Sequence, residues 1–481
     1  MKFILAAIFS LVFFTARSQG YITKDIKSFG ASGDGESNDQ AAFEKAADYF
    51  NKRGGNGKLI ISRGTYIVGE QSFTKGLQNK PAYTGKDVMD LKNIDNFKIE
   101  GEEGSILKYA PGLRYGAFSP TTGEVYDHGN NYFVKRAYLA TIGYCILIEN
   151  SSNIRISGVT MDGNNGNLIL GGIFGDMGRQ IPHTGIYISN SRNIRIDKAS
   201  IHHFGLDAIS VANKQTKESS ALDSITISNS TFEYNSRQGL SWVGGNQLYV
   251  KDCKFNHTGK GKFSSPPGAG VDIEAEVGPV RNGVFENCEF IDNTGCGLVA
   301  DSGNSADCTF TGCTFWGTTS WSIWVTKPGF SFHNCNIYGS VAHGYNSLSS
   351  QDATKFYTCL FEDKPYNGNP VFGSYLIESN NRKRMSFFDC TFISNKKKLC
   401  WFNSTAKSAE EKYQFTNCSF TINNNNLPAR DFAGIIRGAA LKNCTFTFTD
   451  PDAKRKRYYL GGYSEGSNAN LGGNKIIVTN Q

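Results

Sequence analysis

A short pattern of inward-facing residues recurs through most of the chain. In each copy, one polar residue separates a small residue from a large apolar one, as in Cys313-Thr-Phe315. Side chains alternate along a strand, so the first and third residues lie on the same face. Eleven copies occur, 22 to 40 residues apart. This period predicts a solenoid with a short strand in every coil. The copies begin at Val159, Ala199, Ser230, Cys253, Cys288, Cys313, Cys335, Cys359, Cys390, Cys418 and Cys444.

Eight of the 12 cysteines occupy the small position of this pattern. Asn or Asp precedes six of them, as in Asn287-Cys288, and both residues tolerate the left-handed backbone of a sharp corner. A chain that leaves the cytoplasm suggests disulfides, but a repeated inward position favours a ladder of buried thiols, because buried free Cys packs as a small apolar residue. The pairing of the four remaining cysteines stays open: Cys145, Cys296, Cys308 and Cys400.

A second strand in each coil can be aligned on a glycine or small residue. Gly239-Leu-Ser241-Trp-Val243 and Gly270-Val-Asp272-Ile-Glu274 are two examples, with Leu, Val and Ile facing inward. Two positions after the glycine come Tyr187, Ser210, Ser241, Asp272, Val299 and Trp324; four after it come Ser189, Ala212, Val243, Glu274 and Asp301. Stacking parallel strands about 4.8 Å apart gives a right-handed parallel β-helix, a rod about 50 Å long over ten intervals.

The start of the chain predicts a cap for this rod. Residues 39–53 carry apolar residues at helical spacing and end near Gly54-Gly55, so a helix there can cover the open end and block edge pairing. The segments Phe29-Gly-Ala-Ser-Gly-Asp-Gly35, Asn38-Asp39, Gly57-Lys-Leu59 and Gly64-Thr-Tyr66 resemble the N-terminal cap of pectate-lyase-like β-helix proteins. That superfamily includes polygalacturonases, iota-carrageenases and polysaccharide lyases. The resemblance implies an exported carbohydrate-active protein, but a fold does not fix the chemistry.

The predicted organisation has three parts. Residues 1–18 are predicted to be a signal peptide, with Lys2, an apolar run and a small-residue cleavage site. Residues 19–68 form the cap, and residues 69–481 form the β-helix with an excursion at about 110–136. The protein is expected to be secreted or periplasmic, monomeric and without a membrane span. The formal charge of +7 over 481 residues is too small to indicate nucleic-acid binding.

Carboxylates gather on the outward positions of three neighbouring coils. Asp272 and Glu274 share one face of one strand, so their Cα atoms are expected about 6.6 Å apart. Inverting glycosidases need such a gap to place a water beneath the sugar, and mutual repulsion would keep one carboxyl protonated. We therefore predict Asp272 and Glu274 as the catalytic pair. The strand resembles the Glu-x-Asp strand of iota-carrageenases, with Glu274-Ala-Glu276 as a second match.

Other side chains near this pair are candidates for binding substrate. Trp321 and Trp324 suit stacking against sugar rings, and Lys260 and Lys262 lie on a long connection, Phe255 to Gly270, expected to overhang the site. The predicted substrate-binding residues are Asp207, Arg237, Gln238, Asp301, Trp321, Trp324, Lys260 and Lys262. No cofactor is required and no metal ligand is assigned. The carboxylates could instead bind calcium or solvate a turn.

Three functions remain open. The favoured one is an inverting glycoside hydrolase acting on an acidic or sulfated polysaccharide, to which the mild positive charge is suited. The alternative is a lyase that cleaves a uronate-containing glycan, with a base from the long connection, such as His257, or from His202 and Glu233 on adjacent coils, and with Arg237 or calcium neutralising the uronate. The third is a non-catalytic glycan-binding rod. Polygalacturonase motifs are not found in order, so galacturonan hydrolysis is not indicated.

Overall fold

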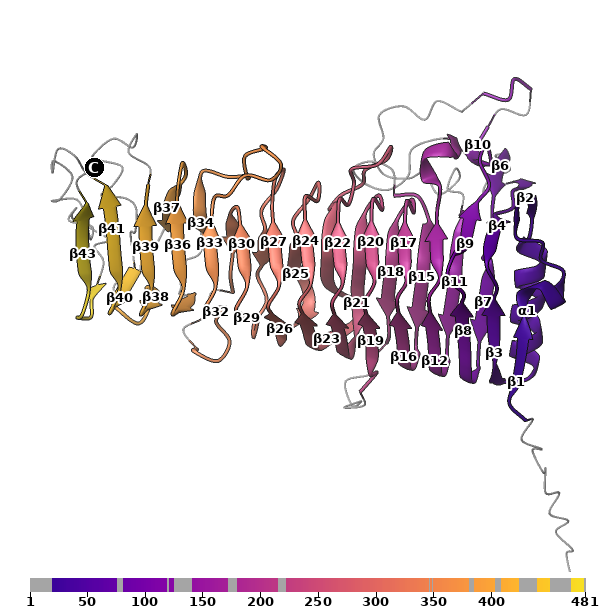
Figure 1. Ribbon diagram of the computed structural model, residues 1–481, viewed down its shortest axis with the longest axis horizontal. Coiled ribbons are helices and arrows are strands. Elements are labelled where there is room, and N and C mark those ends of the chain that lie inside the picture. Colours follow the sequence, from indigo (N-terminus) through magenta and orange to yellow (C-terminus); the bar gives the residue numbers. More distant parts are fainter. Residues whose placement is uncertain are drawn as a thin grey trace, which may run out of the picture.

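The structure is a long rod of parallel strands with one α-helix at its N-terminal end (Figure 1). This computed structural model describes residues 20–75, 81–118, 121–124, 141–171, 180–214, 222–345, 347, 349–379, 385–402, 408–423, 439–449 and 469–479. The predicted signal peptide and most of the predicted excursion at about 110–136 lie outside the described residues. No helix in the described ranges is long and apolar enough to cross a membrane.

Most coils contribute three strands in turn, whereas residues 238–251 and 269–286 each form one continuous strand where other coils have two. In one three-stranded coil these are β15 (His183–Ser189), β16 (Arg192–Asp197) and β17 (Ser200–His202). The first two belong to a 24-stranded sheet that bends round a corner, and the third to a 15-stranded sheet, which we call the inner-ladder sheet. Pairing within both sheets is parallel from coil to coil, as in β15 with β18 and β17 with β20. The predicted parallel β-helix is thereby confirmed.

The remaining strands of the 24-stranded sheet are β1 (Ile22–Asp25), β3 (Gly55–Ile61), β7 (Met89–Lys92), β8 (Asp95–Gly101), β11 (Gly143–Glu149), β12 (Ser152–Ser157), β18 (Asp207–Ala212), β19 (Ile225–Ser228), β21 (Gln238–Lys251), β23 (Ala269–Glu286), β25 (Leu298–Ser305), β26 (Cys308–Thr311), β28 (Ile323–Val325), β29 (Ser331–His333), β31 (Val341–His343), β32 (Lys355–Tyr357), β34 (Tyr375–Ser379), β35 (Ser386–Phe388), β37 (Lys398–Phe402), β38 (Tyr413–Thr416), β40 (Ala439–Lys442) and β42 (Ala469–Asn470).

The remaining strands of the inner-ladder sheet are β2 (Asp34–Asn38), β4 (Gly64–Val68), β9 (Ser105–Tyr109), β13 (Thr160–Asp162), β20 (Thr231–Glu233), β22 (Lys254–Asn256), β24 (Glu289–Ile291), β27 (Thr314–Trp316), β30 (Asn336–Tyr338), β33 (Leu360–Glu362), β36 (Thr391–Ser394), β39 (Ser419–Ile422), β41 (Thr445–Thr449) and β43 (Lys475–Thr479). A small four-stranded sheet stands beside the early coils and consists of β5 (Ser72–Lys75), β6 (Pro81–Thr84), β10 (Arg114–Ala117) and β14 (Ile169–Gly171).

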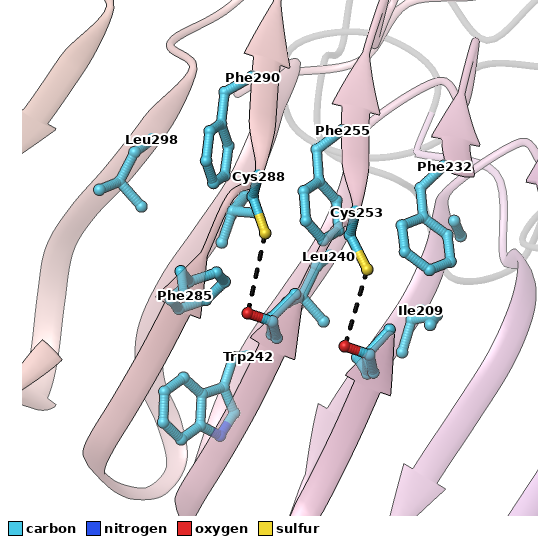
Figure 2. Close-up of a cluster of buried hydrophobic side chains, with 14 of the residues drawn as sticks. Ile209, Phe232, Leu240, Trp242, Cys253, Phe255, Phe285, Cys288, Phe290 and Leu298 are labelled. Carbon is cyan, nitrogen blue, oxygen red and sulfur yellow. Dashed lines mark hydrogen bonds between the residues drawn. The ribbon is translucent and has the colours of Figure 1, made fainter. Parts of the chain in front are cut away.

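The recurring sequence pattern forms the core of the inner-ladder sheet. Phe232 pairs in register with Phe255, and Phe290 with Phe315, whose ring centroids lie 4.5 Å apart. All eight pattern cysteines are buried and free, and each Sγ donates to backbone carbonyl oxygens. Figure 2 shows Cys253 and Cys288 in this arrangement, beside the phenylalanine column. The predicted thiol ladder is confirmed. Cys145, Cys296 and Cys308 are also free thiols.

Asn and Asp make the corners that precede these cysteines. Asp252, Asn287 and Asn417 have φ of 52°, 52° and 57°, in the left-handed region that these short polar residues tolerate. Their side chains also bond along the rod, with Asn287 Nδ2 donating to Asp252 Oδ1 at 3.2 Å. The corner therefore fixes both the turn of each coil and its register with the next.

The helix α1 (Gln40–Lys52) covers the first coil, as predicted for residues 39–53. Its buried face includes Ala42, Phe43, Ala46 and Phe50, and the Phe50 ring lies 4.4 Å from that of Phe97 in β8. The apolar face of the helix thus closes the end of the rod that Figure 1 shows in indigo.

The first part of the glycine-aligned strand is in the predicted register, but the positions four residues after the glycine are not: Ala212 pairs with Gly244 instead of Val243, and a second shift follows Asp272. Ser241 pairs with Asp272, and Asp272 with Val299, as expected. Beyond Asp272 the register shifts, and Glu274 pairs with Ser302 instead of Asp301. The prediction was wrong there because β25 carries one extra residue in a bulge, which a sequence alignment without a gap cannot show.

Candidate active site

One row of outward residues runs along the rod over six coils. Its register follows from the strand pairing, coil by coil: Tyr187, Ser210, Ser241, Asp272, Val299 and Trp324. We call these six residues the outer row. Five intervals between strands span about 24 Å. The predicted carboxylates lie near the middle of this row.

Glycine at the start of four of these six strands lets this part of the coil pack closely. A Cβ atom on Gly239 would lie 2.8 Å from the carbonyl oxygen of Gly270 and 2.9 Å from Cδ1 of Phe255. No side chain fits between the strand and the phenylalanine column. The close approach fixes the backbone that carries Gln238 and Ser241 on either side.

A buried ion pair lies on the coils before Asp272. The side chain of Asp207 is 1% exposed and accepts two hydrogen bonds from Arg237, from Nε at 2.9 Å and from the terminal nitrogen at 2.6 Å. Burial alone would lower the pKa of Arg237, but the Asp207 charge and these bonds raise it above its ordinary value. Arg237 is therefore a permanent cation whose main partner is already Asp207.

Asp272 is buried, although its side chain leaves the outer face of the strand. The residue is 1% exposed. Its Oδ2 accepts a hydrogen bond from Nε2 of Gln238. Among the described residues, Oδ1 of Asp272 and Oε1 of Gln238 have no hydrogen-bond partner. Burial, followed by the charge of Glu274, raises the pKa of Asp272 well above its usual value, while Arg237 opposes the shift. The expectation that Asp272 is open to substrate is wrong in this structure.

Glu274 is the accessible member of the predicted pair. It is half-buried on β23, whereas Glu276 and Asp301 are exposed. Burial, then the charges of Glu276 and Asp301, raise the pKa of Glu274 to about 7, although Arg237 lowers it. A carboxyl group with this pKa can hold a proton near neutral pH and release it to a reacting oxygen.

Aromatic rings flank the carboxylates at both ends of the outer row. The half-buried Trp321 and Trp324 have ring centroids 4.8 Å apart. At the other end, Tyr144 and Tyr187 stack at 4.6 Å with an interplanar angle of 22°. Sequence reasoning found the tryptophans but gave Tyr144 no role. Its pairing with Thr184 one coil on was available only once the first coils were aligned.

The lysines of the long connection contact other parts of the rod. Lys260 Nζ lies 3.2 Å from Asp292 Oδ1, and Lys262 Nζ donates to the carbonyl oxygen of Gly166 at 2.7 Å. The connection itself lies beside the site, since Ser265 N–H donates to Ser236 O, next to Arg237. The binding roles assigned to the two lysines stay predictions.

His257, the other candidate base of the connection, lies on the outer side of the inner-ladder sheet. Its ring stacks on Tyr234 at 4.9 Å, and its Nδ1 lies 3.8 Å from Glu233 Oε1. Calcium binding by the carboxylates stays a prediction. Among described His, Cys, Asp and Glu residues, one group brings three ligand atoms together, and it is Asp162, His202 and His203.

Comparison with known proteins bears on the fold. A family model described as a right-handed β-helix region matches residues 144–337. The match covers 194 of the 481 residues and agrees with the parallel β-helix that the structure shows. Among curated proteins, no sequence matches the chain.

Solved structures give the same picture of the β-helix at low sequence identity. The pre-mature gene product 12 of bacteriophage phi29 aligns with a TM-score of 0.53 and 13% identity, over 95% of this chain and 56% of that one. An N-terminal fragment of the same phage protein aligns with a TM-score of 0.52 and 14% identity, over 94% of this chain and 70% of the fragment. The A-module of the Azotobacter vinelandii mannuronan C-5 epimerase AlgE4 aligns with a TM-score of 0.48 and 12% identity, over 96% of this chain and 100% of the module. At such identities the likeness concerns the fold alone.

Proposed function

We propose that this β-helix is a glycoside hydrolase that cleaves a polysaccharide lying along the outer row. The observation that carries the proposal is Glu274: a half-buried carboxyl whose pKa is raised to about 7, on the outer face of β23 and close to the exposed Asp301. The aromatic pairs at either end of the row supply flat apolar surfaces that suit sugar rings. The resemblance of the N-terminal cap to carbohydrate-active β-helix proteins agrees with this assignment.

The proposed reaction needs one acid and one base. Glu274 donates its proton to the glycosidic oxygen as the bond from that oxygen to the anomeric carbon breaks. Asp301 accepts a proton from a water molecule as the water oxygen bonds to the anomeric carbon from the opposite face, which inverts its configuration. We assign the base to Asp301 instead of Asp272 because Asp301 is exposed, whereas Asp272 is 1% exposed.

Asp272 then acts as a positioning residue. Burial, followed by the charge of Glu274, raises its pKa well above the ordinary value, which favours its protonated form. Its hydrogen bond with Gln238 holds the strand that presents Glu274.

Hydrolysis fits the charges of this site better than β-elimination. A lyase needs a cation that neutralises the uronate carboxylate and a base that removes the neighbouring proton. The guanidinium of Arg237 is held by two hydrogen bonds to Asp207, and Lys260 pairs with Asp292. The carboxylates beside the cleaved bond favour an uncharged sugar ring at that point. The acidic or sulfated groups expected from the net charge of +7 would lie on flanking units.

A screen of neutral, acidic and sulfated polysaccharides tests the proposal. Each reaction is followed for new reducing ends and for the ultraviolet absorbance of an unsaturated uronate. A hydrolase gives new ends without the absorbance, and the configuration of the first product at the anomeric carbon should be inverted. Both signals together would establish a lyase, and binding without either signal would establish a glycan-binding rod.

A further inference from the structure

A second group of chemically active side chains lies on the outer side of the inner-ladder sheet. Asp162 ends β13 and His202 ends β17 one coil later, and the two residues pair in register. His203 follows with φ of 56°, a left-handed conformation that histidine adopts more often than most residues and that turns the chain at this point. Three potential metal ligands from two successive coils therefore meet at one corner of the rod.

The distances within this group match the spacing of ligands on one ion. The Nδ1 atoms of His202 and His203 are 2.8 Å apart, Asp162 Oδ1 is 3.6 Å from His202 Nδ1, and the ligand atoms all lie within 4.8 Å of one another. Ligands bound at about 2.0–2.2 Å to one zinc ion stand about 3 to 3.5 Å apart. Small side-chain movements would bring all three into contact with one ion.

We propose that Asp162, His202 and His203 form a binding site for a divalent transition metal of the zinc type. Two imidazoles and one carboxylate suit Zn²⁺ and its first-row neighbours, whereas Ca²⁺ and Mg²⁺ prefer oxygen ligands only. The side chains of His202 and Asp162 are 27% and 18% exposed, so the ion would reach the site from solvent and keep water ligands.

Neighbouring groups hold the ligands in place. Asp162 Oδ1 accepts the backbone N–H of Asn164 at 2.8 Å, and its Oδ2 lies 3.7 Å from Lys108 Nζ. The His203 ring stacks on Tyr234 at 5.4 Å with an interplanar angle of 10°. Contacts of this kind orient metal ligands in known sites. The Asn164 bond leaves the carboxylate a free lone pair, whereas Lys108 is a competitor that the ion must outweigh.

The proposed ion would join two coils. Its ligands come from β13 and from the end of β17, so binding to the folded chain would stabilise the stack at this point. The site is independent of Glu274 and Asp301, which lie on β23 and β25. Its existence does not depend on the proposed hydrolysis.

Metal binding by the full chain tests the site. The protein is stripped with a chelator, and Zn²⁺ binding is measured by calorimetry and by the rise in melting temperature. Co²⁺ serves as a spectroscopic probe, because its visible bands report nitrogen and oxygen ligands. We expect one ion per chain and a melting temperature that rises with Zn²⁺.

Substitutions identify the ligands. His202→Ala, His203→Ala and Asp162→Asn should each weaken Zn²⁺ binding by at least about tenfold, whereas His333→Ala, a histidine stacked on Tyr357 in another part of the rod, should not. Circular dichroism of each variant checks the fold, and Asp162→Asn keeps the size of the side chain. Absence of Zn²⁺ binding in the wild type, or wild-type affinity in both histidine variants, would overturn the proposal.

Discussion

At the scale of single residues, the site depends on how burial and charge act on Glu274. Water is partly excluded from its carboxyl group and two other carboxylates lie near, so the charged form is disfavoured and its pKa rises to about 7. An ordinary surface glutamate would already be ionised at neutral pH and could not donate a proton.

The raised pKa predicts a pH profile. If Glu274 is the acid, the rate constant kcat should fall as pH rises through about 7, because the proton is lost. Initial rates across a pH series on a cleaved substrate measure this. An alkaline limb that remains at the same pH in Glu274→Gln, measured on its residual activity, would assign the titration to another group.

The same shift predicts how stability depends on pH. The folded pKa of about 7 lies above the ordinary 4.5, so Glu274 contributes stability that is fully present below about pH 4.5 and is lost as pH rises through 7. Urea unfolding at about pH 5 and about pH 8 should show a larger loss for the wild type than for Glu274→Gln, which does not titrate. Equal losses in the two proteins would contradict the burial of this carboxyl.

The Asp207–Arg237 pair predicts a cost in stability. Asp207→Asn leaves a mostly buried guanidinium without its counter-charge and should lower the free energy of unfolding by about 3 kcal/mol. The control is Asp307→Asn. Oδ2 of the exposed Asp307 lies 3.9 Å from Nε of Arg281, and loss of this surface pair should lower the free energy of unfolding by less than about 1 kcal/mol. Equal effects in urea titrations would show that Asp207 is not buried as described.

At the scale of elements, the thiol ladder holds successive coils in register without disulfides. Cys313 Sγ donates to the carbonyl oxygens of Thr311 and Phe285, one on its own coil and one on the coil before. Cys313→Ala should cost about 1–2 kcal/mol through lost packing, and Cys313→Asp far more, because a buried carboxylate there has no counter-charge. Thiol titration of the denatured, unreduced protein should find at least eight free thiols; two or fewer would contradict the ladder.

The left-handed backbone of the Asn corners predicts that glycine is tolerated there better than alanine. Asn417 has φ of 57°, and its Nδ2 donates to Asp389 Oδ1 at 3.0 Å. Both Asn417→Gly and Asn417→Ala lose this hydrogen bond. Only alanine has a Cβ atom that is strained in the left-handed backbone, so the alanine variant should be less stable than the glycine variant by about 1 kcal/mol. Thermal unfolding of the two variants measures the difference, and a more stable alanine variant would contradict the corner geometry.

At the scale of the whole molecule, the fold could be predicted because every coil repeats the same local constraints. Cys313 and Phe315 occupy positions that recur in ten other coils. A wrong assignment of inward and outward positions in one coil is therefore revealed by comparison with the other coils. The cap helix could be predicted from the spacing of its apolar residues alone.

The candidate site could be predicted only in part. The outer position of Asp272 followed from strand alternation, but its burial depends on neighbours such as Gln238, which alternation does not reveal. The bulge before Ser302 shifted Asp301 by one place. The repeat aligns Asp162 with His202, but the position of His203 beside them depends on its left-handed backbone, so the sequence analysis assigned no metal ligand there.

The central claim is that Glu274 and Asp301 cleave a glycosidic bond. On any polysaccharide that the protein cleaves, the most direct measurement compares the rate of new reducing ends for Glu274→Gln, Asp301→Asn and Glu289→Gln, the last a glutamate of the same coil that pairs with Lys254 on the inner-ladder sheet. We predict losses of about 100 to 10,000-fold for the first two and wild-type rates for the third. More than a third of the wild-type rate in either Glu274→Gln or Asp301→Asn would contradict the account.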